Sequence, residues 1–273
     1  MQIQTADEIM VRIDAARAAS PGGVVAFDGD GTLWSGDVGE DFFHAIIARN
    51  DFRPAAVAQL KADAREFGIE DAGGDDDGGT LARRIFDAYV AGQYPEERIC
   101  ELMTWACADW SRGEVDAFCA AQLEGGTLVP RLHAEAMRVV AWARDAGLET
   151  FIVSASPRPI VEAAARVVGV LPDHVVAATA RWSDAAGAER AASADGPARM
   201  LASVHRPIPY GPGKVSSLRE RIGDRTLYAA FGDNAFDVAL LSEALVPVAV
   251  RPKPRLRARA GEVKMLVEIA HER

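Results

Sequence analysis

The segment Val24-Val25-Ala26-Phe27-Asp28-Gly29-Asp30-Gly31-Thr32 decides the fold class of this chain. Its first four residues form a short apolar run, which is typical of a strand buried on both faces of a parallel sheet. The turn residues Pro21-Gly22-Gly23 come directly before the run and mark where the strand begins. Two aspartates, Asp28 and Asp30, follow it at once, so a buried strand is predicted to end in carboxylates.

Further apolar runs with helical patterns between them extend this strand into a sheet. The runs are Thr150–Val153, Val175–Ala178, Leu227–Phe231 and Val246–Val250. Pro247 places the last of them at an edge or an irregular start, because proline cannot donate to a ladder. The helical patterns cover Leu132–Asp145, Pro159–Val168, Lys214–Ile222 and Phe236–Ala244. This alternation predicts an α/β fold with a doubly wound, Rossmann-like parallel sheet.

The stretch from Asp37 to Leu123 departs from this alternation. It contains no convincing strand, and apolar residues such as Phe42, Ile46, Leu81 and Ile85 recur at helical spacing. We therefore predict an all-helical cap over residues 37–123, inserted into a core made of residues 1–36 and 124–273. The acidic run at residues 73–79 inside the cap has loop composition and is interpreted as a solvated linker, not a metal site. Residues 181–212 are expected to form a β-hairpin or a long loop.

Composition limits the function classes. The chain has 273 residues, 49% of them hydrophobic, and a net charge of −10, which argues against a nucleic-acid partner. No stretch approaches the roughly 18–20 apolar residues of a membrane span, and the first 20 residues do not resemble a signal peptide. Cys100, Cys107 and Cys119 lack metal-site spacing and are interpreted as buried free thiols. We therefore expect a cytoplasmic protein with no nucleic-acid or membrane partner; the oligomeric state stays open.

Polar side chains follow three of the predicted strands at the point where each ends. Asp28 and Asp30 follow the first, Ser154 the second, and Asp233 and Asp237 the fourth. Ligands of an open α/β sheet bind outside the carboxyl ends of its strands. These residues, distant in sequence, are therefore expected to meet at one edge of the sheet.

Four motifs occur in a fixed order. They are the aspartate loop Phe27–Leu33, the strand end Phe151–Ser154, the lysine segment Gly211-Pro212-Gly213-Lys214 and the acidic segment Gly232–Asp237. With them the chain resembles the haloacid dehalogenase-like (HAD) hydrolases, and within these the phosphoserine-phosphatase-like branch, from about Val24 to Pro254. The resemblance implies a phosphatase with a helical cap between its first two motifs, where a lid would exclude water and contact the substrate.

The resemblance also assigns roles to the residues. Asp28 would attack phosphorus to form an aspartyl-phosphate, and Asp30 would act as general acid and base. Ser154 would donate to a phosphoryl oxygen, and Lys214 would neutralise charge and hold Asp28. The ligand set implies Mg²⁺, since all its atoms are oxygens. The expected ligands are the Asp28 and Asp233 carboxylates, the Asp30 carbonyl and Asp237, which could instead bind through water or orient Lys214.

Substrate contacts are expected from Gly31, Thr32, Asp37, Arg84, Ala155 and Asn234. Asp37 resembles the acid that meets a substrate amino group in that branch, and Arg84 the cap arginine that meets a substrate carboxylate. Two residues depart from the pattern. Phe236 stands where the branch usually has asparagine, and Trp34 adds a bulky ring beside the aspartate loop. The expected substrate is therefore a small phosphorylated metabolite, with phosphoserine, a phosphorylated amino alcohol, phosphocholine and a sugar phosphate all open.

Two other functions fit the same fold. A phosphotransferase of the superfamily would pass the phosphoryl group to an acceptor other than water. A non-catalytic binding protein could also use this fold, because fold alone does not decide function.

Overall fold

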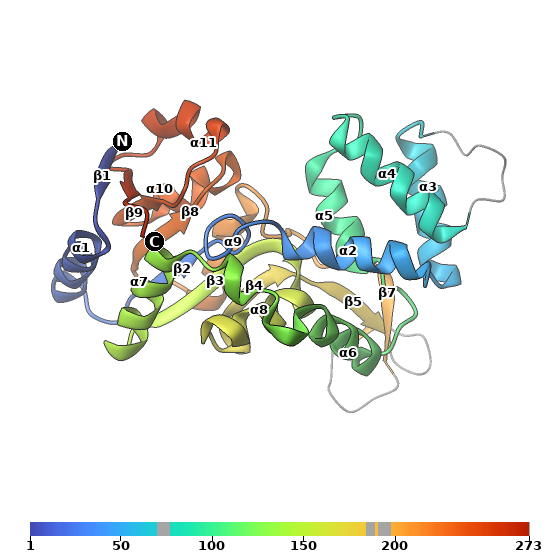
Figure 1. Ribbon diagram of the computed structural model, residues 1–273, viewed down its shortest axis with the longest axis horizontal. Helices are drawn as coiled ribbons and strands as arrows, with labels where there is room; N and C mark the ends of the chain where they lie inside the picture. The colour runs from blue at the N-terminus through green and yellow to red at the C-terminus, as the bar shows by residue number, and fades with distance from the viewer. Residues whose placement is uncertain (70–76, 184–188, 191–197, 273) are drawn as a thin grey trace.

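The computed structural model describes residues 1–69, 77–183, 189–190 and 198–272 (Figure 1). Its centre is a seven-stranded sheet with the order β1-β10-β9-β8-β2-β3-β4 and parallel pairing throughout. The strands are β1 (Gln2–Gln4), β2 (Val24–Phe27), β3 (Glu149–Pro157), β4 (Val175–Ala178), β8 (Leu227–Gly232), β9 (Val246–Ala249) and β10 (Val267–Ile269). The predicted α/β class with a parallel Rossmann-like sheet is confirmed.

Of the two positions that the sequence left open for Pro247, an edge strand or an irregular strand start, the edge is wrong. Its strand, β9, pairs with β8 on one side and with β10 on the other. The pairing with β10 uses Val248 and Ala249, so Pro247 lies outside that ladder and its missing N–H is not needed there. The edge is formed instead by the three-residue strand β1, which is too short to produce a recognisable sequence pattern.

The residues of β2 explain why the sheet is buried on both faces. Val25 and Phe27 belong to one apolar cluster, whereas Val24 and Ala26 belong to a second one across the sheet. Side chains of a strand alternate between faces, so four consecutive apolar residues serve both layers. Phe27 also stacks on Phe231 of β8 with ring centroids 4.1 Å apart, which fixes the two central strands against each other.

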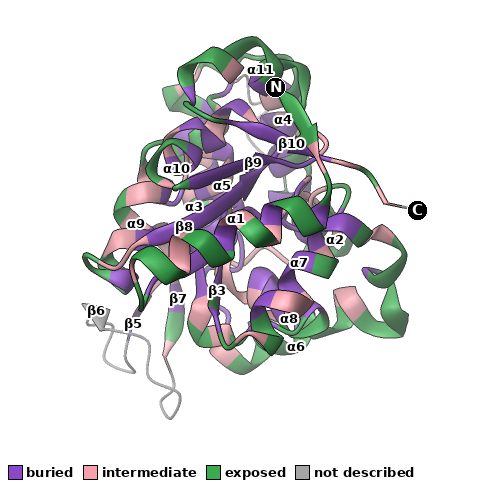
Figure 2. Cartoon of the chain, turned by 90° about the vertical axis from the view of Figure 1, so that its left-hand side faces the viewer, coloured by how far each residue is buried: buried purple, intermediate pink, exposed green. Residues whose placement is uncertain are grey.

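Helices cover both faces of the sheet. The first cluster includes α1 (Ala6–Ala19), α7 (Ala134–Asp145) and α8 (Arg158–Val168), and the second includes α9 (Gly213–Ile222), α10 (Val238–Glu243) and α11 (Pro254–Arg259). Figure 2 shows the strands β8 and β9 buried while α1 alternates between buried and exposed turns. Short 3-10 helices connect elements: η1 (Glu124–Gly126), η2 (Val129–Arg131), η3 (Pro172–His174), η4 (Ala235–Asp237) and η5 (Ala260–Glu262). The helix predicted at Phe236–Ala244 is therefore split between η4 and α10.

The segment between β2 and β3 is helical where it is described. It contains α2 (Val38–Arg49), α3 (Pro54–Glu66), α4 (Gly78–Val90), α5 (Glu96–Trp105) and α6 (Arg112–Leu123). Figure 1 shows α2 to α5 gathered to one side of the sheet, whereas α6 packs along α8 of the core. Residues 73–76 of the acidic run lie outside the described residues. Asp77 caps α4 by accepting the Thr80 N–H at 2.8 Å.

An antiparallel hairpin reaches from the core to the cap, as the sequence allowed for residues 181–212. It consists of β5 (Ala180–Ser183), β6 (Glu189–Arg190) and β7 (Arg199–Val204). The N–H of Asp109 donates to the carbonyl of Met200 at 2.8 Å, and the Met200 N–H donates to the Trp110 carbonyl at 3.0 Å. Strand β7 also packs on α5 and α3, so backbone hydrogen bonds hold the base of the cap to this hairpin.

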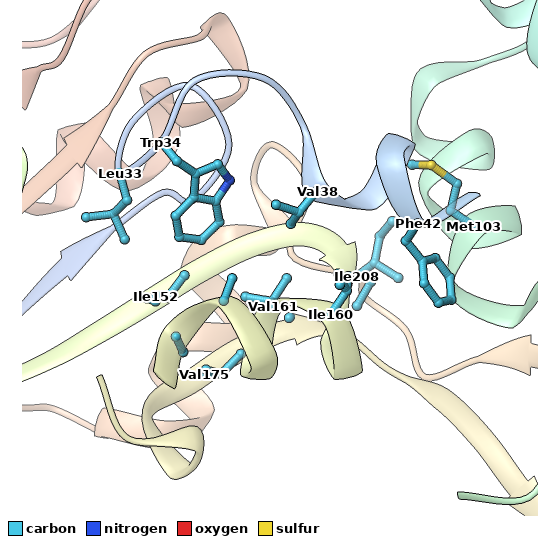
Figure 3. Close-up of a cluster of buried hydrophobic side chains, with 14 of the residues drawn as sticks. Leu33, Trp34, Val38, Phe42, Met103, Ile152, Ile160, Val161, Val175 and Ile208 are labelled. Carbon is cyan, nitrogen blue, oxygen red and sulfur yellow. The ribbon is translucent and has the colours of Figure 1, made fainter. Parts of the chain in front are cut away.

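A continuous apolar cluster joins cap and core. Figure 3 shows it running from Leu33 and Trp34 along β3 to Phe42 of α2 and Met103 of α5. All three cysteines are free, with Cys107 and Cys119 buried as predicted and Cys100 half-buried. In the described parts of the chain, no helix is long and apolar enough to cross a bilayer.

Candidate active site

The polar strand ends meet in one cavity of about 420 Å³ between the sheet and the cap. Its floor is formed by residues that follow β2 and β8 and by the last residues of β3, together with Lys214 at the start of α9. The predicted convergence at the carboxyl edge of the sheet is therefore what the structure shows for Asp28, Asp30, Ser154, Asp233 and Asp237.

A buried lysine joins two of the carboxylates. Lys214 Nζ donates to Asp28 Oδ1 at 2.7 Å and to Asp237 Oδ1 at 2.5 Å. The backbone N–H of Asp28 donates to the Phe231 carbonyl at 2.9 Å, so β8 fixes the position of the residue. In the described part of the chain, the hydrogen bonds to the Asp28 carboxylate all go to Oδ1, which leaves Oδ2 for another partner.

The three buried charges affect one another strongly. Burial raises the pKa of Asp28 well above its usual value, and the Asp237 carboxylate adds to this while Lys214 opposes it. Burial disfavours the charged form of Lys214, but Asp237 and Asp28 outweigh it and raise the pKa of Lys214. The lysine is therefore held as a cation, and the site needs further positive charge to keep all of its carboxylates ionised.

Asp233 supplies an acceptor that the protein leaves unused. Its side chain is 1% exposed, and its Oδ1 has no hydrogen-bond partner among the described residues. Lys253 Nζ lies 2.8 Å from Oδ2 as an ion pair, without hydrogen-bond geometry that satisfies this oxygen. Carboxylate oxygens of Asp28, Asp233 and Asp237 lie within 4.8 Å of one another. A buried carboxylate with one oxygen, Oδ1, unused in an oxygen-only cluster fits a hard divalent cation such as Mg²⁺.

Asp237 differs from the other two acids. Its Oδ1 accepts from Lys214, and its Oδ2 accepts from the backbone N–H groups of Asp233 at 3.0 Å and Asn234 at 2.9 Å. Both oxygens are therefore already engaged by the protein. Of the two roles expected for Asp237, orienting Lys214 is the one that its contacts support.

Gly31 is required by the close approach of the aspartate loop to Asp233. It has a φ of +84°, and a Cβ at this position would lie 2.2 Å from Asp233 Oδ2. Gly147 offers a matched comparison, because it has a φ of +69° but a Cβ added there would meet no heavy atom within 4 Å.

We therefore predict different stability losses for alanine at the two glycines. Gly147→Ala should lose about 1 kcal/mol of unfolding free energy from left-handed backbone strain alone. Gly31→Ala should lose roughly 1–3 kcal/mol more, because the new methyl group must displace the Asp233 carboxylate. Denaturant unfolding without added metal measures both. Equal losses at the two positions would show that the contact with Asp233 is unimportant.

Asp30 is held in place by four donors. Its Oδ1 accepts from the Trp34 Nε1–H at 2.8 Å and the Val38 N–H at 2.7 Å. Its Oδ2 accepts from Ser156 Oγ at 2.7 Å and, more weakly, from Ser154 Oγ at 3.5 Å. The bulky ring of Trp34, noted as a departure in the sequence, is thus buried and positions the second aspartate.

The predicted substrate-binding residues separate into two groups. Gly31, Asp37, Ala155 and Asn234 line the cavity, and Asp37 also caps α2 by accepting the Glu40 N–H at 2.8 Å. Thr32 is fully buried and is not a lining residue. Arg84 does not line this cavity either; it lies on a separate surface depression with Phe67, Gly68 and Asp87. The structure therefore does not bring the expected carboxylate-binding arginine to the site.

Several lining residues were not identified from the sequence. They are Glu40, Tyr89, Glu96, Ser156, Tyr210 and Lys253. Lys253 could have been found, because it lies just beyond the predicted fifth strand and the strand-end rule applies to it as well. Glu40, Tyr89 and Glu96 lie on cap helices, where helical periodicity does not indicate which polar side chains will face the core.

Comparisons with known proteins give matches to a family model and to solved structures. The family model for haloacid dehalogenase-like hydrolases matches residues 25–242. A Bordetella pertussis Tohama I protein of unknown function is 22% identical, with a TM-score of 0.62 over 90% of this chain and 97% of that one. A functionally unknown Anaerococcus prevotii protein is 14% identical, with a TM-score of 0.61 over 98% and 93% of the two chains.

A substrate-bound phosphoserine phosphatase has the same fold. It is 15% identical to this chain, with a TM-score of 0.50 over 91% of this chain and 93% of that one. The search of curated proteins gives no match. At these identities the solved structures establish the fold that the two chains share, and no more.

Proposed function

This chain belongs to the haloacid dehalogenase-like hydrolase family, and we propose that it is a Mg²⁺-dependent phosphatase acting on small phosphomonoesters through Asp28. The observation that carries the proposal is the joining of Asp28 and Asp237 by Lys214, with Asp30 and the unused Oδ1 of Asp233 in the same cavity. A single buried ion pair could serve the stability of the fold alone and would not indicate catalysis. A nucleophile, a proton donor and a carboxylate oxygen left for a metal ion around one cavity are the parts that phosphoryl transfer requires.

The first step uses the free oxygen of Asp28. Oδ2 forms a bond to phosphorus while the bond from phosphorus to the alcohol oxygen breaks, which leaves the phosphoryl group on Asp28. Asp30, protonated at this stage, gives its proton to the departing alkoxide. Lys214 holds Asp28 through Oδ1 and neutralises charge beside the phosphoryl oxygens.

The second step reverses the role of Asp30. Now ionised, it accepts a proton from a water molecule whose oxygen bonds to phosphorus and releases phosphate from Asp28. Ser156 and Trp34 hold the Asp30 carboxylate during both steps. The residues that would hold Mg²⁺ are Asp28 and Asp233, with the Asp30 carbonyl. When bound, the ion supplies positive charge that reduces repulsion between carboxylate and phosphate.

Turnover of p-nitrophenyl phosphate tests the proposal. We expect release of inorganic phosphate with Mg²⁺ and its loss after chelation with EDTA, restored by excess Mg²⁺. Release of phosphate into water, with no requirement for a second alcohol, distinguishes hydrolysis from phosphotransfer. A protein that turns over no phosphomonoester with any divalent cation would contradict the proposed function.

Metal binding has a readout that does not depend on activity. We predict that Mg²⁺ raises the melting temperature, since a ligand at 100 times its Kd stabilises the native state by about 2.7 kcal/mol. Asp233→Asn should lose most of this increase, because it removes the carboxylate charge that the ion would meet. The exposed Asp224→Asn is the matched control and should keep the full increase. If Mg²⁺ raised the melting temperature of both variants equally, the ion would bind at a site that does not include Asp233.

The proposed setting is the cytoplasm, with a small phosphorylated metabolite as the partner. The chain has three free thiols, and a reducing compartment keeps cysteines in that state. The cavity of about 420 Å³ is suited to a small-molecule substrate.

A further inference from the structure

The cap side of the cavity has a composition that the phosphoryl chemistry does not require. Two carboxylates reach it from cap helices, Glu40 from α2 and Glu96 from α5. Three aromatic rings also line the cavity, Tyr89 from α4 of the cap and, from the core, Tyr210 just before α9 and Phe236 in η4. In the proposed reaction the phosphoryl group lies at Asp28, so the alcohol part of a phosphomonoester would lie against the remaining lining of the cavity.

The cations that line the cavity are already paired with carboxylates of the protein. The cations that line the cavity in the described part of the chain are Lys214 and Lys253. Lys214 is bound to two carboxylates, and Lys253 Nζ lies 2.8 Å from Asp233 Oδ2. A negatively charged substrate group beyond the phosphate would therefore meet carboxylates and no available cation.

Glu96 is only weakly neutralised by its neighbours. Among the described residues its ion-pair partner is Arg255 at 3.5 Å, and the Arg255 side chain is 72% exposed, so solvent screens the attraction. Burial raises the pKa of Glu96 even though Arg255 and Lys253 lower it. A cation arriving inside the cavity would supply the charge that these rim residues do not.

The aromatic rings favour the same kind of ligand. The rings of Tyr210 and Phe236 pack with centroids 4.6 Å apart, which fixes both beside the cavity. Cations bind over aromatic faces, most strongly where water is excluded. Carboxylates together with aromatic rings recognise an ammonium group better than a neutral sugar hydroxyl or a carboxylate.

We propose that the substrate is the phosphomonoester of a cationic alcohol, an amino alcohol or its quaternary ammonium form, with no carboxylate. Glu40 and Glu96 attract the cation, and Tyr89, Tyr210 and Phe236 surround it. This inference rests on the proposed phosphatase function and adds the substrate class. It also gives a physical role to Phe236, the residue that departs from the sequence pattern of the family branch.

Substrates matched in shape but not in charge test the inference. The probes are phosphocholine, its neutral isostere 3,3-dimethylbutyl phosphate, phosphoethanolamine and O-phosphoserine, each measured as kcat/KM with Mg²⁺. We expect phosphocholine to exceed its neutral isostere by about tenfold or more, and phosphoethanolamine to exceed phosphoserine by a similar factor. Glu96→Gln and Glu40→Gln should each lower the first ratio by roughly three- to tenfold.

Glu97→Gln is the matched control, since Glu97 is an exposed residue beside Glu96 and does not line the cavity. It should leave both ratios unchanged. A neutral isostere that reacts as well as phosphocholine would overturn the recognition of a cation. Phosphoserine reacting as well as phosphoethanolamine would overturn the exclusion of a carboxylate. In both cases p-nitrophenyl phosphate would still be hydrolysed, whereas loss of all turnover would overturn the phosphatase itself.

Discussion

Replacing Asp28 with asparagine is expected to lower kcat/KM for p-nitrophenyl phosphate by at least roughly 10⁴-fold. An amide oxygen is a far poorer nucleophile toward phosphorus than a carboxylate oxygen, and no phosphoryl group can be carried through the first step. The change keeps the shape of the side chain and a carbonyl oxygen to accept from Lys214, which donates to Asp28 at 2.7 Å. The loss should therefore be chemical and not a consequence of unfolding.

The control for this change is Asp145→Asn, an equivalent substitution at a side chain that is 73% exposed. It should retain wild-type turnover, and both variants should unfold cooperatively. Beryllium fluoride, which mimics a phosphoryl group on a carboxylate, should raise the melting temperature of the wild-type protein with Mg²⁺ but not that of Asp28→Asn. Substantial turnover by Asp28→Asn would show that Asp28 is not the nucleophile, even if the protein proved to be a phosphatase.

The floor of the site could be predicted because it follows from the strand ends. Asp28, Ser154 and Asp233 each lie directly after or at the end of a buried apolar run, and parallel strands bring such ends to one edge. The same rule places Lys253 near the edge, since it follows β9. These positions depend on short-range pattern and a general property of parallel sheets, both of which are present in one sequence.

The cap side could not be predicted in the same way. Arg84 and Tyr89 both lie on α4, but only Tyr89 lines the cavity, whereas Arg84 lies on a separate depression. Which side of an amphipathic helix meets the core depends on how the cap packs, and that is set by contacts such as those of β7 with α5. The expected contact between Arg84 and a substrate carboxylate relied on resemblance alone, and the packing of the cap places Arg84 outside the cavity.

The short strands β1 and β10 show a second limit of sequence patterns. Strands β1 and β10 each have three residues, which is too few for alternation or an apolar run to be recognised. Their absence from the prediction led to the wrong edge assignment for Pro247. The error left the site unaffected, because the catalytic strands β2, β3 and β8 lie away from that edge.

Removing the buried lysine is expected to affect both stability and activity. Lys214→Met leaves Asp28 and Asp237 facing each other in a site where the lysine side chain is 4% exposed. Removing one partner of a buried ion pair typically destabilises a protein by about 3–5 kcal/mol, because the remaining charge is buried without a partner. Turnover should fall by roughly 10²–10³-fold, since charge stabilisation beside the phosphoryl group is lost. Denaturant unfolding and kcat/KM measure the two effects.

The double variant Lys214→Met with Asp237→Asn separates these effects. Asparagine keeps an oxygen for the N–H groups of Asp233 and Asn234, while its charge is removed. Only one of the two facing carboxylates, that of Asp28, then remains charged, so most of the lost stability should return. Activity should stay low, because neither substitution restores a cation beside Asp28. If activity returned together with stability, the lysine would be a structural residue only, and its role in phosphoryl transfer would have to be withdrawn.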